Sequence, residues 1–309
     1  MKRLFILASA AIVALASCSK TQVVYNDAPE EIGFKAVTGA MTKAVQTTDV
    51  FTQTIGVIAY NHDATLSSYF PNAEFTKTTV DGVTTWNGSK FWPIGTTLDF
   101  MVYSPYQVTG DPATVVPTNT ADSKQLVVTV ADNDKNSIEE QVDYMYGDTY
   151  LEDKDKNSTL TANFKHALTQ VTVNFTGSEN VTLNSAILSD TAQDGTYTVQ
   201  YLPAINPMIS WVSGDLDNDL TLKPTTPTQL NATAISTSYL VVPTVASAID
   251  INYTMAGGSA LDKNIDLNET WVAGSHYTYN VDISANEIKF KVTVTPMATG
   301  TVTSGVTIE

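Results

Sequence analysis

The chain has 309 residues, and its 32 Asp and Glu against 16 Lys and Arg give a net charge of −16. A surface this acidic repels nucleic acids and anionic lipid head groups, which excludes polyanions as partners. The single cysteine excludes an intramolecular disulfide, so stability has to come from hydrophobic cores. The length is typical of two domains.

The first segment, residues 1–17, is typical of a signal peptide. Lys2 and Arg3 precede an apolar stretch, residues 4–17, that is too short and too rich in small residues to span a membrane. It ends at the only cysteine, in "LASC", which resembles a bacterial lipobox. The resemblance implies that Cys18 carries a diacylglycerol and a fatty acid such as palmitate, and that it starts the mature lipoprotein. The alternative is an ordinary secretory signal followed by an unmodified cysteine.

Residues 18–30 are polar and predict a flexible tether. Residues 31–43 predict one strand followed by a loop of small residues. The apolar face of this strand comprises Ile32, Phe34 and Ala36. Lys35 and Lys43 are compatible with plain surface lysines. Taken alone, that reading is preferred, and Lys43 is notable only for its place between this first strand and the next domain.

Most of the chain alternates apolar and polar residues with the period of a β-strand. The clearest stretches are 54–60, 97–103, 159–164, 170–175, 248–255, 276–283 and 287–294. Spacers rich in Thr, Asn, Asp, Gly and Pro separate them, which favours antiparallel sheets with one buried face each. The sequence therefore predicts an all-β fold with two antiparallel sandwich domains. A charged stretch at 151–159 indicates the boundary between a domain of residues 44–157 and one of residues 158–295.

The chain ends on another alternating run, "GTVTSGVTIE", within residues 296–309. Its apolar face comprises Val302, Val306 and Ile308. A terminal strand with an unpaired edge is an aggregation hazard unless something covers it. The run therefore either packs on its own domain or serves another one. Pro296 has no N–H for a sheet ladder, and it separates this tail from the preceding strand.

Catalytic chemistry is poorly represented. The three histidines, His62, His166 and His276, are far apart, and no Cys/His metal spacing or phosphate-binding glycine loop occurs. We therefore expect no enzyme, no cofactor and no metal site. Two acidic loops match a calcium loop only in part, and solvated turns are the expected alternative. These loops contain Asp132, Asp134 and Asn136, and Asp215, Asp217 and Asp219.

Five short motifs resemble, in their order, those of the fimbrillin family, the subunit class of type V pili. They are "WPIGTTLDFMVYSPY", "VDYMYG", "LTANFKHALTQVTVNF", "YLVVP" and "WVAGSHYTYNVDI". The resemblance implies two transthyretin-like β-sandwich domains. It also implies export of a lipoprotein precursor to the outer membrane, where a trypsin-like protease removes the lipid and the first strand together.

According to the same resemblance, the groove left by Ile32, Phe34 and Ala36 is then filled by the C-terminal strand of the next subunit. Residues 296–309 become the donor strand, with Val302, Val306 and Ile308 inserted, and repetition builds an extracellular fimbrium that supports adhesion. The implied partners are other fimbrial subunits, the protease, the outer membrane before processing, and a receptor on a host or bacterial surface.

The chain departs from the family at the cleavage position, where "MTKA" has Lys43 in place of the usual arginine. Either the protease accepts lysine, or the subunit is a pilus anchor that is not processed. A second alternative is a surface lipoprotein that binds glycans through loops and tryptophans. The tryptophans concerned are Trp86, Trp92, Trp211 and Trp271. Residues 190–192, "DTA", resemble a bacterial O-glycosylation acceptor, and an ordinary loop threonine is the alternative.

Overall fold

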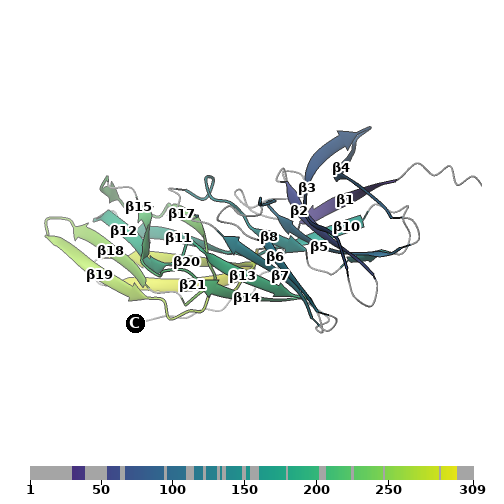
Figure 1. Ribbon diagram of the computed structural model, residues 1–309. Coiled ribbons are helices and arrows are strands. Elements are labelled where there is room, and N and C mark those ends of the chain that lie inside the picture. Colours follow the sequence, from purple (N-terminus) through teal and green to yellow (C-terminus); the bar gives the residue numbers. More distant parts are fainter. Residues whose placement is uncertain are drawn as a thin grey trace, which may run out of the picture.

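The computed structural model describes residues 30–38, 54–62, 67–93, 96–108, 115–120, 123–130, 133, 137–147, 151–153, 160–178, 180–201, 207–223, 226–245, 248–284 and 287–297. These residues form 21 strands and no helix, which confirms the predicted all-β class. None of these ranges contains a helix able to cross a membrane. Figure 1 shows an elongated molecule with one large sheet at one end, two sheets at the other and a smaller sheet between them.

The large sheet has the strand order β2-β3-β4-β1-β10-β8-β5-β9, and β2 pairs with β5 as well. The pairings thus run from β2 round to β5 and back to β2, which encloses a core. The strands are β1 (Glu31–Thr38), β2 (Ile55–Asn61), β3 (Ser68–Val80), β4 (Val83–Phe91), β5 (Leu98–Ser104), β8 (Met145–Gly147), β9 (Leu151–Asp153) and β10 (Leu160–His166).

The middle sheet has the order β14-β13-β7-β6. It joins β6 (Val115–Thr120) and β7 (Ser123–Val130) to β13 (Gly195–Gln200) and β14 (Met208–Ser213), which follow much later in the chain. The register of β7 and β13 runs from Gln125↔Gln200 to Val130↔Gly195. This sheet therefore links the first and second halves of the sequence.

The far end is a sandwich of two sheets, in the orders β17-β11-β20-β21 and β15-β12-β18-β19, with β16 paired to β12. The first contains β11 (Thr169–Gly177), β17 (Ile235–Val241), β20 (Ser275–Ile283) and β21 (Ile288–Pro296). The second contains β12 (Val181–Thr191), β15 (Asn218–Lys223), β16 (Thr228–Gln229), β18 (Ala248–Met255) and β19 (Ala260–Asp266). Side chains such as Val173, Leu183, Ile251 and Tyr279 form one buried core in this sandwich.

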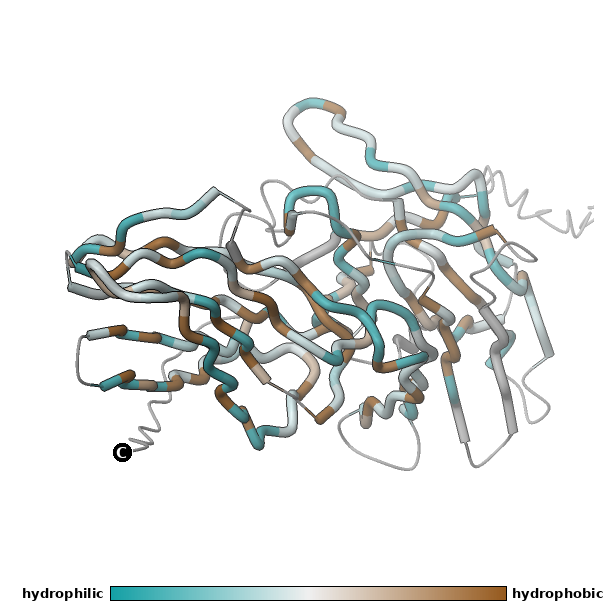
Figure 2. The backbone as a smooth tube through the Cα atoms, turned by 90° about the vertical axis from the view of Figure 1, so that its left-hand side faces the viewer, coloured by the Kyte–Doolittle hydropathy of each residue, from teal (hydrophilic) through white to brown (hydrophobic). Residues whose placement is uncertain are grey.

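Strands β2 and β5 of the large sheet are buried on both faces, whereas the alternation predicted one buried face. Phe100 and Val102 of β5 point into the core enclosed by the large sheet, as the pattern indicated. Met101 and Tyr103 of the same strand are equally inaccessible, because they lie in a second core with the middle sheet. Figure 2 shows apolar positions recurring along the strands in the body of the molecule.

This second core draws residues from both halves of the chain, including Tyr103, Val128, Tyr197, Leu240 and Met297. The charged stretch used to predict a domain boundary begins with β9 and ends just before β10, and both strands belong to the large sheet. Sheet pairing and core packing therefore both cross residue 157. The division into residues 44–157 and 158–295 stays a prediction.

Candidate functional site

The residues expected to form the removable strand lie in β1, inside the large sheet. Ile32 and Phe34 are completely buried. Ala36 pairs with Ala162, and its side chain is outside the described part. Cys18, Lys43, Val302, Val306 and Ile308 lie outside the described residues as well.

β1 is inserted between β4 and β10. It pairs in parallel with β10, from Phe34↔Leu160 to Thr38↔Phe164. On its other side it pairs antiparallel with β4, where the register ends at Phe34↔Trp86. The strand is therefore an internal member of the sheet that is held by ladders on both edges, although residues 39–54 separate it from β2 in the sequence.

The side chain of Phe34 occupies an aromatic slot. Its ring meets the ring of Phe75 edge-on with centroids 5.5 Å apart, and the ring of Phe100 edge-on at 5.4 Å. Trp92 contacts Phe100 in the same manner at 5.6 Å. Edge-to-face geometry adds roughly 0.5–1.5 kcal/mol per pair beyond burial. Removal of β1 would thus open a preformed apolar slot in the sheet.

The start of β1 is fixed by polar contacts as well. The Trp92 N–H donates to the Glu30 carbonyl at 2.9 Å, and the Ser89 N–H donates to Glu31 Oε1 at 2.8 Å. Ser89 has a φ of 51°, a left-handed conformation that breaks the regular run of β4. These contacts define where the strand enters the sheet.

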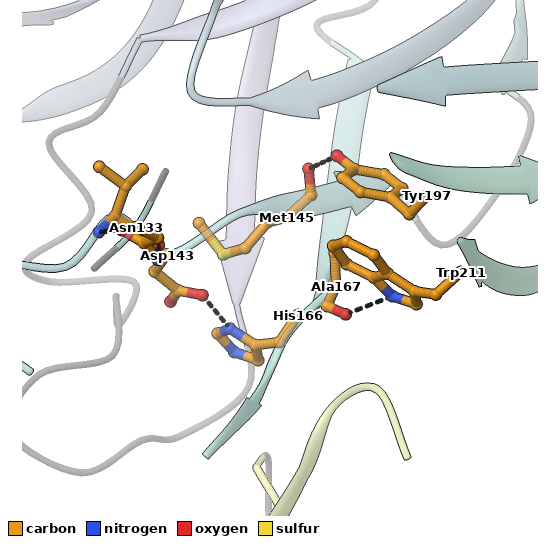
Figure 3. A network of polar contacts seen from close by, with 8 residues as sticks. Asn133, Asp143, Met145, His166, Ala167, Tyr197 and Trp211 are labelled. Carbon is orange, nitrogen blue, oxygen red and sulfur yellow. Dashed lines mark hydrogen bonds and ion pairs between the residues drawn. The ribbon is translucent and has the colours of Figure 1, made fainter. Parts of the chain in front are cut away.

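The histidines have separate partners, and the structure does not bring them together. His166 and Asp143 are both buried, and His166 Nδ1 lies 2.9 Å from Asp143 Oδ1. Figure 3 shows this contact beside two hydrogen bonds from the middle sheet, one from Trp211 Nε1 to the Ala167 carbonyl at 2.9 Å. The other runs from the Tyr197 hydroxyl to the Met145 carbonyl at 3.5 Å. His166 is thus a structural residue at the junction of the sheets.

The other two histidines also serve local contacts. His62 Nδ1 lies 2.9 Å from Asp99 Oδ1, where the Asp99 side chain is buried. His276 Nε2 lies 2.8 Å from Thr172 Oγ1, and burial lowers the pKa of His276 below its usual value of 6.5. Each histidine thus has its own local partner, and among the described residues no contact joins one of these pairs to another.

The acidic loops are only partly described. Asp132, Asp134 and Asn136 lie outside the described residues, whereas Asp217 and Asp219 are exposed. Within the part of the chain that the structure covers, His, Cys, Asp and Glu side chains form no group of three or more able to hold a metal ion. Asp219 Oδ1 instead accepts a long bond of 3.4 Å from the Asp190 N–H.

The tryptophans do not form exposed platforms for sugars. Trp86, Trp92 and Trp271 are at most 7% exposed, and only Trp211 is half-buried. Trp271 Nε1 donates to the Tyr279 hydroxyl inside the sandwich core. The glycan-binding alternative therefore loses three of its four tryptophans, whereas the part of it that rests on loops stays a prediction.

Thr191, the candidate glycan acceptor, is fully buried in the fold. Its hydroxyl donates to the Asn218 carbonyl at 2.8 Å, and the neighbouring Ala192 is also buried. In the folded chain this hydroxyl is out of reach of a modifying enzyme. The threonine acts as a structural residue there.

Sequence reasoning missed the neighbours of β1. Leu160, Ala162 and Phe164 were recognised as one apolar face, and they do point into the core while Thr161, Asn163 and Lys165 are exposed. Nothing in that alternation indicates that β10 pairs in parallel with β1, because strand pairing across so long a separation leaves no periodic signal.

Comparison with known proteins gives the family. A family model described as fimbrillin-like matches residues 38–296, from the last residue of β1 to the end of β21. No curated protein matches the chain. The crystal structure of a protein from Bacteroides uniformis, described as a cell adhesion protein, is 18% identical in sequence to this chain. The two align with a TM-score of 0.55 over 87% of this chain and 99% of that one.

Two further structures share the fold at similar distance. One, also named for cell adhesion, comes from Bacteroides ovatus, with 13% identity, a TM-score of 0.53, and coverage of 89% of this chain and 100% of that one. A fimbrial protein from Bacteroides vulgatus has 15% identity and a TM-score of 0.51, covering 87% and 99%. At these identities the structures bear on the fold alone, and it is the family model, which spans most of the sequence, that shows that this chain belongs to the fimbrillin-like family.

Proposed function

We propose that the chain is a structural subunit of a type V fimbria, made as an outer-membrane lipoprotein precursor and assembled by donor-strand exchange. The observation that carries the proposal is the position of β1. It is an internal strand between β4 and β10 that closes an aromatic core, yet it is joined in sequence to the following strand only through residues 39–54. Family membership and the similar fimbrial structure support the same role.

In this mechanism a trypsin-like protease cuts after Lys43. The cut releases residues 18–43, so the lipid on Cys18 and the whole of β1 leave together. Cleavage would therefore free the subunit from the outer membrane and activate it for assembly in one step. Because the residue at this position is lysine, the protease has to accept lysine as well as arginine.

The empty groove would be costly to leave open. Its edges on β4 and β10 would expose unpaired backbone groups, which any extended segment can satisfy. Loss of Ile32 and Phe34 would uncover apolar surface worth about 1.5–3 kcal/mol for each side chain. The unpaired backbone groups and the exposed apolar surface together favour the binding of another strand.

The tail, residues 296–309, is the proposed occupant. Val306 and Ile308 repeat the two-residue spacing of Ile32 and Phe34, so they can enter the same two positions of the slot. The contact is head-to-tail, and such a contact generates an open filament. Dissociation requires a whole ladder to break at once, which gives the polymer kinetic stability.

The partners follow from this mechanism. They are copies of this chain or other fimbrial subunits, the protease, the outer membrane before processing, and a receptor on a host or bacterial surface. The mature product is an extracellular fimbrium that supports adhesion, and the reaction needs no cofactor. In this proposal the chain is a structural subunit and has no enzymatic role.

The proposal is tested on the lipid-free chain of residues 19–309. Treatment with a lysine-specific protease is followed by gels of heated and unheated samples and by N-terminal sequencing. We expect cleavage after Lys43 and a ladder that disappears on heating. The Lys43→Gln variant is expected to remain monomeric, while Lys20→Gln, a matched change in the tether, assembles normally.

Deletion of residues 300–309 separates cleavage from assembly. The truncated chain should be cut after Lys43 and remain monomeric. A ladder of unchanged strength from this truncation would refute donation by the tail. Resistance of Lys43 to the protease in the wild-type chain would instead favour an anchor that keeps its lipid.

A further inference from the structure

The β3–β4 hairpin extends beyond the sheet to which it belongs. The pairing of β2 with β3 ends at Ile55↔Phe75, and the pairing of β1 with β4 ends at Phe34↔Trp86. From there the two strands continue as a ribbon, residues 76–85, which we call the arm. No other strand in the described ranges pairs with the arm. Figures 1 and 2 show the hairpin standing off the rest of the molecule.

The arm ends in a tight turn with an apolar tip. Asp81 and Gly82 have φ angles of 51° and 78°, the positive values that a two-residue hairpin turn of this kind needs. Val80 and Val83 flank the turn as a cross-strand pair, and they are 65% and 54% exposed. A two-stranded ribbon is marginally stable on its own. Contact with a partner would therefore stabilise the ribbon and cover the valines at its tip.

The charge of the arm favours a second copy of this chain as that partner. The whole chain has a net charge of −16, so most contacts between copies meet repulsion. The arm carries one positive residue, Lys77, and one negative residue, Asp81, and its remaining polar side chains are all threonines. It is thus a neutral projection on an acidic molecule, and another acidic copy can approach it without that penalty.

The arm also lies beside the position where a second copy would bind. It begins next to Trp86, where β4 stops pairing with β1, so it flanks the groove that β1 occupies. In the donating copy the last described residue is Met297, and only residues 298–301 precede Val302. Four extended residues span at most about 14 Å. The surface around Met297 of the donor is therefore drawn close to the groove and the arm of the acceptor.

That surface of the donor carries exposed valines. The Met297 N–H donates to the Gly274 carbonyl at 2.6 Å, inside a turn closed by a bond from the Ser275 N–H to the Val272 carbonyl. Val272 is 55% exposed, and Val245, which forms a bridge with nearby Thr270, is 62% exposed. We call Val245 and Val272 the valine patch.

We propose that the arm of each subunit packs on the valine patch of the subunit that donates its tail, as a second contact between copies. This inference rests on the proposed function, since it takes the tail as the donor strand. The tail on its own would be a single contact between successive subunits. A contact between the arm and the patch would fix the angle between successive subunits.

The test uses the lipid-free chain of residues 19–309, which has no cysteine. Mixed Val83→Cys and Val272→Cys subunits, cleaved and then oxidised, should give a covalent dimer that persists on heating without reductant. Val108→Cys, at another exposed valine, replaces Val83→Cys as the matched control and should give none. Equal yields from the two mixtures would overturn the inference.

A second measurement keeps the inference testable without crosslinking. The double variant Val80→Asp/Val83→Asp should polymerise at least tenfold more slowly, with the urea midpoint of the monomer unchanged. Val212→Asp, on an exposed residue of β14, should match the wild type. If the double variant assembles at the wild-type rate while deletion of 300–309 abolishes assembly, the arm contact is wrong and the donor-strand function stands. If the deletion has no effect, both fail.

Discussion

Replacement of Phe34 by alanine should destabilise the unprocessed chain by about 3–5 kcal/mol, the usual cost of removing a buried phenylalanine ring. The ring is completely buried and meets Phe75 and Phe100 edge-on, so its loss leaves a cavity that those rings cannot close without breaking their own contacts. Urea unfolding followed by tryptophan fluorescence measures the change, because Trp86 and Trp92 lie in the same core.

The matched control is Lys35→Ala on the same strand. Lys35 is exposed, so its truncation should change the free energy of unfolding by less than about 0.5 kcal/mol. Phe34→Ala should also let the tail displace β1 in uncleaved chains, which would appear as a ladder on unheated gels. A loss of stability below about 1 kcal/mol for Phe34→Ala would show that the slot is not the closed core described here.

Three further outcomes are expected. The tail contains no aromatic residue to refill the slot of Phe34, so either Val306→Phe or Ile308→Phe should raise the temperature at which the polymer dissociates; no gain from either would argue against insertion of that pair. Because burial lowers the pKa of His276, stability is present above its usual value of 6.5 and falls as pH drops towards the folded value; His276→Asn should flatten that slope in urea titrations. Intact mass should show no sugar on Thr191 of the folded chain, and a modified threonine would contradict its burial.

The class of fold could be predicted from the sequence because alternation is a local signal. Ile55, Val57 and Ala59 were expected on one buried face of a strand, and they do line the core of the large sheet. The opposite face of that strand was expected to be solvated, yet Ile58 is fully buried. Its burial depends on the middle sheet, which is assembled from distant parts of the chain. No local pattern in the sequence indicates that this sheet covers the strand.

The candidate site was predictable in part for the same reason. The apolar face of β1 was visible in its spacing, whereas its parallel partner β10 and the protruding arm were not. The "DG" pair at Asp81 and Gly82 is a hairpin signal, but the length of ribbon beyond the sheet depends on where β1 and β2 stop pairing. The tryptophans were candidates for ligand binding because the presence of a tryptophan in a sequence does not show whether its side chain lies in the core or on the surface.

The junction of the sheets constrains the order in which the chain can fold. β1 needs β10, β7 needs β13, and the Gln141 side chain bonds both the N–H and the carbonyl of Leu240. Most native pairings thus wait for segments synthesised much later, and structure dominated by distant contacts forms slowly. An emerging chain can therefore pair local hairpins such as β3–β4 early, but it cannot complete the large sheet or the middle sheet. We expect it to stay open enough for transport across the inner membrane and to fold only after nearly all of it has crossed.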